Sequence, residues 1–231
     1  MRRRLPAAVL FDMDGTLVDT ERLWWAAVEQ VAAGMGRPLT EADMPDVVGR
    51  PAAHTAAHLH RTGARLHRTG GPSAGDPGAL AAELDTAFAA RVTREVVPCP
   101  GVPRLLDELA AAGVPMAIVS ASPRLVVDVV RDVLGANRFA LTVAAEDTVR
   151  SKPAPDPYLA ASAALGVDPR ACVAVEDSPT GIASAEAAGC AVLAVTSTVR
   201  IRPAARRTVL DSLEPVDLAL LASLTAPAER K

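Results

Sequence analysis

The stretch VLFDMDGTLVDT, residues 9–20, decides the fold because it joins an apolar run to a cluster of acidic and turn-forming residues. Residues 6–11, PAAVLF, predict a short strand that is buried on both faces, since an unbroken apolar run ends there at turn-forming residues. Asp12 and Asp14 follow at once, and Gly15 comes next. Carboxylates this close repel one another, so the chain needs a reason to hold them together at the end of a buried strand.

The sequence beyond residue 96 alternates predicted strands with predicted helices. Strands are expected over residues 114–122, 140–146, 171–177 and 191–196, and helices over residues 103–112, 123–135, 155–166 and 179–189. Such an alternation implies right-handed crossovers and a parallel sheet that is covered on both faces. We therefore expect an α/β fold with a Rossmann-like parallel sheet, to which the first strand also belongs.

An insertion separates the first strand from the rest of the predicted sheet. It begins with a helix over residues 21–33 and contains a Gly- and Pro-rich run at residues 69–79, which breaks any helix. Residues 40–95 show no good strand pattern, so we expect helix, loop and helix there, after the helix over residues 21–33. The predicted organisation is a discontinuous core domain, residues 1–18 and 97–231, with a small α-helical domain at residues 19–96.

The amino-acid composition favours a globular protein and argues against nucleic-acid and membrane partners. The chain has 231 residues, of which 50% are hydrophobic, and this suits one sizeable core with a smaller appended unit. A net charge of -3 and an aromatic fraction of 3% argue against a nucleic-acid partner. No apolar run is long enough to span a bilayer, and the first apolar stretch is interrupted by Asp12 with no cleavage site after it, so neither a membrane partner nor a signal peptide is expected.

The cysteines indicate the compartment. Cys99, Cys172 and Cys190 form an odd, sparse set without a CxxC pair, which fits a reducing cytosol better than a disulfide framework. We expect a cytoplasmic monomer that acts on a small molecule.

Polar residues stand where the predicted strands end. In an open parallel sheet, ligands bind at the carboxyl ends of the strands. The residues at or after those ends are Asp12, Asp14, Ser120, Lys152, Glu176 and Asp177. These groups are scattered over the sequence, yet the predicted sheet brings them to one rim.

The residue types at this rim suit phosphoryl transfer. A cluster of Asp12, Asp14 and Asp177 is tolerable only with a cation between the carboxylates, and hard oxygen ligands suit Mg²⁺. Lys152 and the hydroxyl of Ser120 are then placed to hold an anion, which is the electrostatic cradle that phosphoryl transfer requires. Because side chains at i and i+2 of an extended chain share a side, Asp12 can act as nucleophile while Asp14 acts as acid and base.

Four segments together resemble the motifs of the haloacid dehalogenase-like hydrolase superfamily. They are FDMDGT (11–16), Ser120 after an apolar strand, SKPAPDPY (151–158) and VEDSPTGIASAEAAG (175–189), in the order of that superfamily. With the intervening helices they cover nearly the whole chain. The insertion resembles the small α-helical cap of the β-phosphoglucomutase and sugar-phosphatase branch.

The resemblance implies a role for each matching residue. By this resemblance, Asp12 is the nucleophile and a Mg²⁺ ligand, and Asp14 is the general acid and base, with its backbone carbonyl on Mg²⁺. Ser120 and Lys152 bind the phosphoryl group, together with backbone N–H groups around Met13 and Asp14. Asp177 is a further Mg²⁺ ligand and is supported by Glu176.

Three sequence features indicate which branch of the superfamily the chain resembles most. Asp14 argues for phosphoryl chemistry, because the dehalogenases of this superfamily lack that residue. Trp24 stands where the β-phosphoglucomutases carry a histidine, which favours a phosphatase over a mutase. Residues 19–96 contain no lysine, whereas phosphonoacetaldehyde hydrolases need one there for a Schiff base. We expect a Mg²⁺-dependent phosphatase of a small phosphomonoester, with a phosphomutase or a non-catalytic phosphosugar-binding regulator as alternatives.

The cap is expected to select the substrate. Candidate specificity residues are Trp24, Gly49, Arg50 and His54. His54, His58 and His60 have a metal-like spacing, but we expect surface or packing roles because a metal site needs a further convergent ligand. Hexose, deoxyhexose and glycerol phosphates, phosphoglycolate and nucleoside monophosphates all fit the core, and the sequence leaves the choice among them open.

Overall fold

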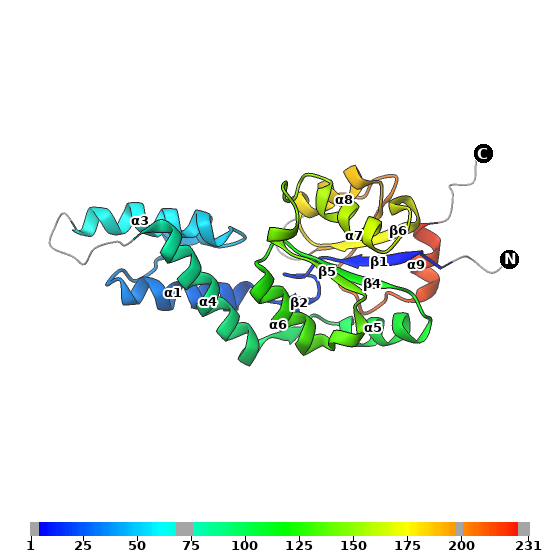
Figure 1. Cartoon of the computed structure of the whole chain (residues 1–231), viewed down its shortest axis with the longest axis horizontal. Coiled ribbons are helices and arrows are strands. Elements are labelled where there is room, and N and C mark those ends of the chain that lie inside the picture. The colour runs from blue at the N-terminus through cyan, green and yellow to red at the C-terminus, as the bar shows by residue number, and fades with distance from the viewer. Residues whose placement is uncertain (1–4, 68–75, 197–200, 226–231) are drawn as a thin grey trace. The chain divides into compact units, whose positions relative to one another are not determined.

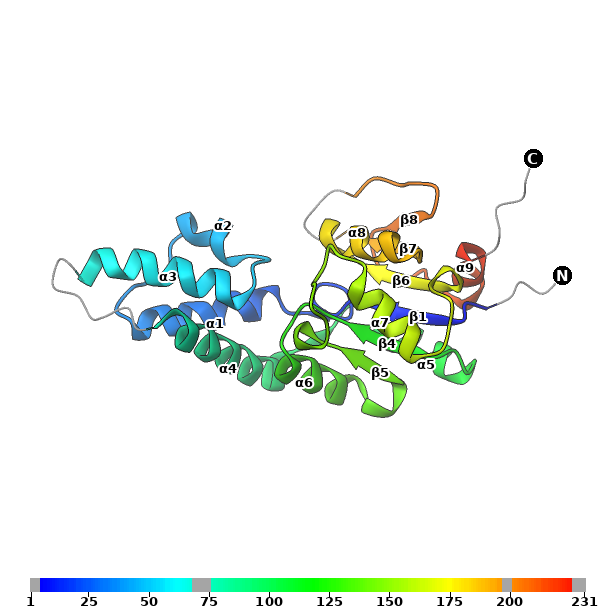
Figure 2. The same cartoon turned by 45° about the horizontal axis from the view of Figure 1, so that its top comes forward.

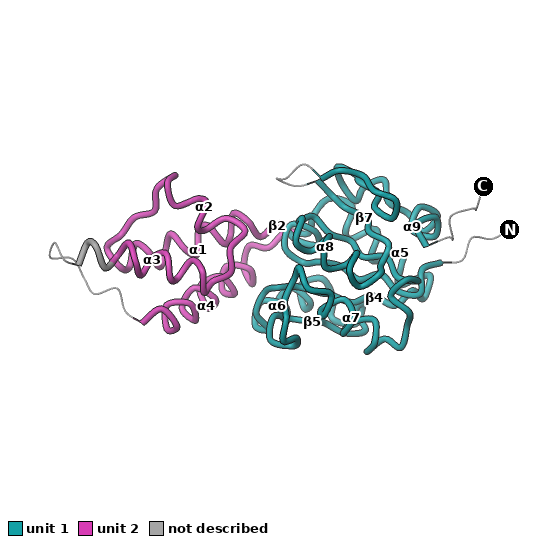
Figure 3. The backbone as a smooth tube through the Cα atoms, turned by 90° about the horizontal axis from the view of Figure 1, so that it is seen from above, with its two compact units in different colours: residues 1–18, 98–231 teal, residues 19–97 magenta. Residues whose placement is uncertain are grey.

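The computed structural model describes residues 5–67, 76–196 and 201–225 (Figure 1). The chain divides into two compact units, Met1–Val18 with Pro98–Lys231 and Asp19–Val97 (Figure 3). We call them the core unit and the helical unit. The second passage between them falls after Val97, one residue beyond the expected division.

A six-stranded parallel sheet forms the centre of the core unit. Its order is β5 (Leu141–Val143), β4 (Met116–Val119), β1 (Ala8–Phe11), β6 (Cys172–Glu176), β7 (Ala191–Val195) and β8 (Arg207–Leu210). All five strand pairings are parallel. This confirms the Rossmann-like α/β prediction, and it gives the first strand a central place between β4 and β6.

Helices cover both faces of this sheet. They are α5 (Val102–Ala111), α6 (Arg124–Leu134), α7 (Asp156–Ala164), α8 (Pro179–Ala188) and α9 (Leu218–Leu224), with single 3₁₀ turns at Ala136–Arg138, Ala145–Asp147 and Pro169–Ala171. Figure 1 shows α7 and α8 on one face of the sheet and α5 and α6 on the other. Across the described residues, no helix is both long and apolar enough to cross a bilayer.

The local sequence explains where these helices begin and end. In α6, Val126, Val130 and Leu134 recur every four positions and are buried, so one stripe of the helix faces the sheet. In α8, the hydroxyl of Ser178 accepts the first-turn amide of Gly181 at 3.0 Å, which caps the helix. Gly189 then adopts a positive φ of 95° and ends it.

The helical unit contains α1 (Glu21–Gly34), a 3₁₀ turn at Glu41–Asp43, α2 (Met44–Val47), α3 (Ala52–His67) and α4 (Pro77–Glu95) (Figure 2). Helix α4 packs against both α1 and α3. Trp24 of α1 and Phe88 of α4 meet edge to face, with ring centroids 5.3 Å apart. Helices α3 and α4 agree with the two helices expected within residues 40–95, and the turn at residues 41–43 and α2 are additions.

One part of the predicted loop is wrong. Residues 69–75 lie outside the described residues, but Pro77, Gly78 and Ala79 form the first turn of α4 rather than a loop. The carboxylate of Asp76 accepts the amide of Ala79 at 2.9 Å, and proline is well suited to the first helical position. The Asp-Pro pair therefore marks the start of a helix, not the continuation of a loop.

Two very short strands lie where the chain passes between the units. They are β2 (Val18–Asp19) and β3 (Val97–Pro98), which form a separate two-stranded sheet. The amide of Cys99 also donates to the carbonyl of Leu17 at 3.0 Å. Strands of two residues have no periodicity, so the sequence pattern did not reveal them.

Candidate active site

The end of β1 sets the position of the first carboxylate. The amide of Asp12 donates to the carbonyl of Val175 at 2.9 Å, so the ladder with β6 continues one residue past the strand. The carbonyl of Met13 then accepts the amides of Leu17 and Val18, at 2.9 and 3.1 Å, and this curls the chain into a turn. Asp12 is thereby fixed at the carboxyl edge of the sheet.

Gly15 lets the acidic segment after β6 approach this turn. Its φ is +79°, and a Cβ added there would lie 2.3 Å from a carboxylate oxygen of Asp177. A side chain at this position would both strain the backbone and push Asp177 away. The glycine of the FDMDGT motif therefore makes room for a carboxylate that is distant in the sequence.

Three carboxylates converge at this edge. Oxygens of Asp12, Glu176 and Asp177 lie within 4.8 Å of one another, and Asp12 and Glu176 are buried. Burial is the main cause that raises the pKa of Asp12 well above its ordinary value, and the nearby carboxylates add to it although Lys152 opposes the rise. A site with this surplus of negative charge is suited to a cation.

Lys152 stands among these carboxylates. Its ammonium donates to Oδ1 of Asp12 at 2.5 Å and to Oε1 of Glu176 at 2.7 Å, and its side chain is only 6% exposed. Burial by itself lowers the pKa of a lysine, but the two carboxylates outweigh it and raise the pKa of Lys152 above its ordinary value. The lysine therefore carries a fixed positive charge in the site.

The carboxylate of Asp14 meets the end of β4. Its Oδ2 accepts the hydroxyl of Ser122 at 2.7 Å and, more weakly, that of Ser120 at 3.4 Å. The hydroxyl of Ser120 in turn accepts the amide of Ser122 at 2.9 Å. Ser122 was missed by sequence reasoning, although the repeat VSAS offers two serines at i and i+2 on the same strand end.

Glu176 is fixed by further contacts. The hydroxyl of Tyr158 donates to its Oε1 at 2.6 Å, and the hydroxyl of Ser178 donates to its Oε2 at 3.2 Å. A Cβ at Gly181 would lie 2.0 Å from both oxygens, so the first turn of α8 is packed directly against this carboxylate. Tyr158 was also missed, and its signal was that it is the only tyrosine in the chain.

The structure thus brings together the predicted core residues within one unit. The carboxyl edge of the sheet and the segments that follow it carry all six of them: Asp12, Asp14, Ser120, Lys152, Glu176 and Asp177. The side chain of Met13 is buried, so only its backbone faces the turn described above.

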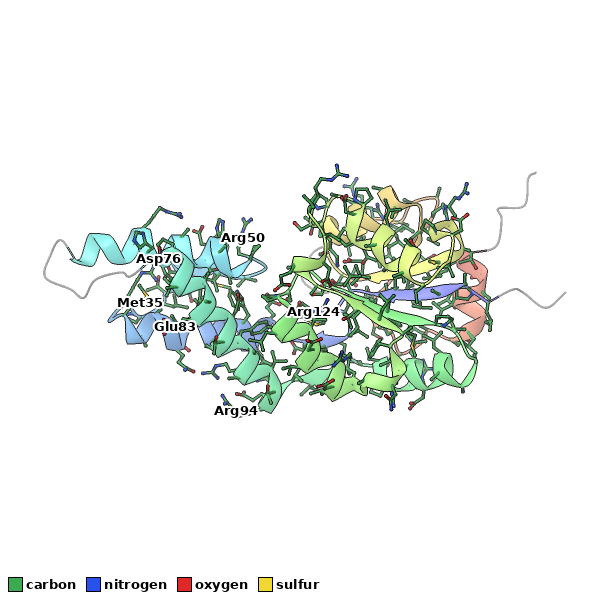
Figure 4. All side chains as sticks on the ribbon, viewed as in Figure 1. Met35, Arg50, Asp76, Glu83, Arg94 and Arg124 are labelled. Carbon is green, nitrogen blue, oxygen red and sulfur yellow. The ribbon has the colours of Figure 1, made fainter. Side chains whose placement is uncertain are left out.

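The four candidate specificity residues lie in the helical unit. Trp24 is largely buried, and its indole N–H donates to the carbonyl of Val47 at 2.7 Å, which ties α1 to the end of α2. Gly49 has a positive φ of 65°, and open space surrounds the place of its missing Cβ. Arg50 is exposed near the start of α3, with its Nε bonded to the carbonyl of Pro45 (Figure 4). His54 is exposed and pairs with Asp46 at 2.9 Å.

A second cluster of charges lies in the helical unit. Asp43 is buried and accepts hydrogen bonds from Arg37 and from His58, the latter at 2.7 Å. Burial acts to raise the pKa of Asp43, but hydrogen bonds from His58, Arg37 and Thr40 outweigh it and hold the pKa well below its ordinary value. His58 also lies 3.3 Å from Asp46. His54 and His58 are therefore both hydrogen-bonded to aspartates of the helical unit, which agrees with the expected packing role.

Comparison with known proteins gives a consistent result. The family described as haloacid dehalogenase-like hydrolase matches residues 6–189. Hexitol phosphatase A of Escherichia coli K12 is 35% identical over 192 residues, which are 80% of this chain and 81% of that protein. Fructose-1-phosphate phosphatase YqaB of the same strain is 33% identical over 186 residues, 79% of this chain and 93% of that protein.

A solved structure matches most of the chain. The crystal structure of CbbY from Rhodobacter sphaeroides in complex with phosphate has a TM-score of 0.77 and 26% identity, and the match covers 91% of this chain and 96% of that one. The likeness extends over both units of the chain.

Proposed function

Because this chain belongs to the haloacid dehalogenase-like hydrolase family, we propose that it is a Mg²⁺-dependent phosphatase that hydrolyses a small sugar phosphate. The observation that carries the proposal is the contact between Lys152 and Asp12 inside a cluster of three carboxylates, two of them buried. A nucleophile, an anion-binding cation and a set of hard oxygen ligands are thus collected in one place. Hexitol and fructose-1-phosphate phosphatases among the relatives support a sugar phosphate as the substrate class.

The donor set fits Mg²⁺. Asp12, Glu176 and Asp177 offer oxygens at a mutual spacing that allows one ion to contact them together. We assign the metal to these carboxylates and, from the family resemblance, to the carbonyl of Asp14. When bound, Mg²⁺ neutralises charge on the phosphoryl group and keeps the carboxylates ionised.

In the first step Asp12 attacks phosphorus and forms an aspartyl-phosphate. Lys152 and the hydroxyl of Ser120 hold the oxygens of the phosphoryl group during this attack. Asp14 gives its proton to the departing sugar alkoxide, which is a poor leaving group without one. The bond that forms joins Asp12 to phosphorus, and the bond that breaks joins phosphorus to the sugar oxygen.

In the second step Asp14 takes a proton from a water molecule, and that water attacks phosphorus and releases inorganic phosphate. Asp12 leaves as a carboxylate and the site returns to its starting state. The hydroxyl of Ser122 supports Asp14 in both steps, because its 2.7 Å hydrogen bond fixes the orientation of the carboxylate.

We assign the helical unit the role of a cap that selects the substrate. Within it, the bond from Trp24 to Val47 holds the end of α2, directly before Gly49 and Arg50. The exposed guanidinium of Arg50 is a donor for sugar hydroxyls or a second anionic group. The cysteines are sparse and form no CxxC pair, which supports a reducing compartment, and we propose a cytoplasmic monomer.

The test is release of inorganic phosphate from a panel of hexitol, hexose and glycerol phosphates, phosphoglycolate and nucleoside monophosphates. We expect hydrolysis of at least one sugar phosphate with Mg²⁺, and loss of activity with EDTA or with Asp12→Asn. Activity that survives in both would contradict the nucleophile and the metal assignment.

The same assay separates a phosphatase from a phosphomutase. A phosphatase yields free sugar and one inorganic phosphate per turnover, whereas a mutase yields an isomerised sugar phosphate and needs a bisphosphate primer. We expect the first outcome, since Trp24 is a packing residue whose indole N–H is already bonded within the helical unit.

A further inference from the structure

The only tyrosine of the chain is buried where a phenylalanine would meet the needs of packing. Tyr158 is 0% exposed and belongs to the apolar cluster that includes Leu10, Ala117 and Ala174. A buried hydroxyl costs free energy unless it is hydrogen-bonded, and this one donates to Oε1 of Glu176 at 2.6 Å. The hydroxyl therefore has a specific partner, and that partner lies in the active site.

The oxygen that accepts this hydrogen bond is shared with the active-site lysine. Oε1 of Glu176 also accepts from Lys152 at 2.7 Å, and Lys152 reaches Asp12 at 2.5 Å. Tyr158, Glu176, Lys152 and Asp12 thus form one chain of hydrogen bonds. The ammonium of Lys152 also lies 5.4 Å from the centroid of the tyrosine ring, so the ring and its hydroxyl both face this chain.

The other side of Glu176 is fixed by backbone and by a second hydroxyl. Gly181 packs against both carboxylate oxygens, and Ser178 donates to Oε2 at 3.2 Å. Removal of the tyrosine hydroxyl leaves Oε1 with Lys152 as its donor among the contacts described above. Without the tyrosine hydroxyl, Oε1 of Glu176 can move with the ammonium of Lys152 and no longer holds that ammonium in place.

This matters when Asp12 carries the phosphoryl group, and the proposal here rests on the proposed function. In the aspartyl-phosphate the carboxyl group of Asp12 is bonded to phosphorus and no longer carries a negative charge of its own, so its attraction for Lys152 falls. Glu176 is then the carboxylate that holds the ammonium beside the phosphoryl group. We propose that Tyr158 is a positioning residue: its hydroxyl fixes Glu176, and Glu176 keeps Lys152 on the phosphoryl group when Asp12 no longer attracts it.

Tyr158→Phe tests this directly, because it removes the hydroxyl and keeps the ring. The matched control is Ser162→Ala, which removes another buried hydroxyl from α7; that hydroxyl donates to the carbonyls of Tyr158 and Leu159. With saturating Mg²⁺, we expect Tyr158→Phe to lower kcat about tenfold and to weaken binding of inorganic phosphate about fivefold, as loss of one hydrogen bond to a charged group predicts. Ser162→Ala should stay within about twofold of the wild type in both measurements.

A purely structural role for Tyr158 predicts a different result. The variant would then unfold at a lower temperature, while kcat and phosphate affinity of the folded protein would match the wild type, and this outcome overturns the proposal. Equal losses in the Ser162→Ala control would overturn it as well. A wild type that hydrolyses no phosphomonoester would instead refute the proposed function, and calorimetric binding of phosphate would still decide the role of Tyr158.

A spectroscopic measurement on the wild type does not depend on the variant's folding. Because the chain has one tyrosine, 3-fluorotyrosine places a single ¹⁹F label at Tyr158. We expect its resonance to shift when inorganic phosphate and Mg²⁺ are added, and to stay unmoved in Lys152→Met. No shift in the wild type would mean that Tyr158 is not connected to the phosphoryl site.

Discussion

The chain holds two clusters of charges, one at the sheet edge of the core unit and one in the helical unit. At the sheet edge, the carboxylates of Asp12, Glu176 and Asp177 converge, and the ammonium of Lys152 contacts Asp12 and Glu176. In the helical unit, Asp43 accepts hydrogen bonds from both Arg37 and His58. The first cluster has an excess of negative charge, whereas the second pairs its buried carboxylate with partners that stabilise it.

The two clusters shift the pKa of their buried aspartates in opposite directions. The pKa of Asp12 is raised by burial and by its carboxylate neighbours, so the folded protein without a metal disfavours its ionised form. The pKa of Asp43 is lowered, so folding favours its ionised form. The carboxylates at the sheet edge keep an excess of negative charge after folding, so this cluster is suited to binding a ligand. The charge of Asp43 is compensated by Arg37 and His58 within the folded unit, so that cluster is suited to a structural role.

Replacing an aspartate at the sheet edge by asparagine should lower the catalytic rate more than it lowers stability. We expect Asp14→Asn to lower kcat on a sugar phosphate about 10³-fold, because it removes the general acid and base. With p-nitrophenyl phosphate, whose leaving group needs no proton, the variant should release one equivalent of nitrophenolate rapidly and then turn over slowly. Rapid-quench or stopped-flow kinetics would detect this burst.

The absence of a burst would change the interpretation of Asp14. If Asp14→Asn is equally inactive on both substrates and binds inorganic phosphate as the wild type does, Asp14 is needed before the first proton transfer. Its role would then be to orient the site rather than to move protons.

Amide substitution in the helical unit should instead affect stability. We expect Asp43→Asn to lower the free energy of unfolding by about 3 kcal/mol, because it leaves a buried Arg37 without its carboxylate. The control is Asp46→Asn, which removes a more exposed partner of His54 and His58 and should destabilise the protein clearly less than Asp43→Asn. Urea denaturation measures both values, and equal losses would show that burial does not distinguish the two aspartates.

The contribution of Asp43 should also depend on pH in a defined direction. Its folded pKa lies below the ordinary value of 3.8, so its stabilising effect is fully present above that value and is lost as the pH falls toward the folded pKa. The difference in unfolding free energy between wild type and Asp43→Asn should therefore be large at pH 7 and should shrink below about pH 4. A difference that stays constant over this range would mean that ionisation of Asp43 is not what stabilises the unit.

Much of the core could be predicted because its sequence signals are local. Apolar runs that end at polar or turn-forming residues predicted the central strands, and the helices predicted over residues 103–112 and 179–189 lie close to the observed α5 and α8. Strand β8 was missed because it is a half-buried edge strand in an arginine-rich stretch. Helix α9, LALLASL, was missed because seven residues are too few for a clear period.

The residues of the candidate site also differ in whether the sequence could predict them. Residues within the motifs could be named from the sequence, because each motif directly follows a strand. Ser122 and Tyr158 could not be assigned, since their roles depend on Asp14 and Glu176, which are 108 and 18 positions away. Likewise, nothing local shows that His58 faces Asp43, because the fold of the helical unit brings them together.

The most direct test of the contrast is the effect of Mg²⁺ on thermal unfolding of the wild type, Asp177→Asn and Asp46→Asn. We predict that Mg²⁺ at about 100 times its dissociation constant stabilises the wild type by roughly 2.7 kcal/mol relative to EDTA. Asp46→Asn should gain as much, whereas Asp177→Asn should gain little at the same concentration. Equal stabilisation of all three proteins, or none in the wild type, would contradict the claim that the carboxylates at the sheet edge are held together for a divalent cation.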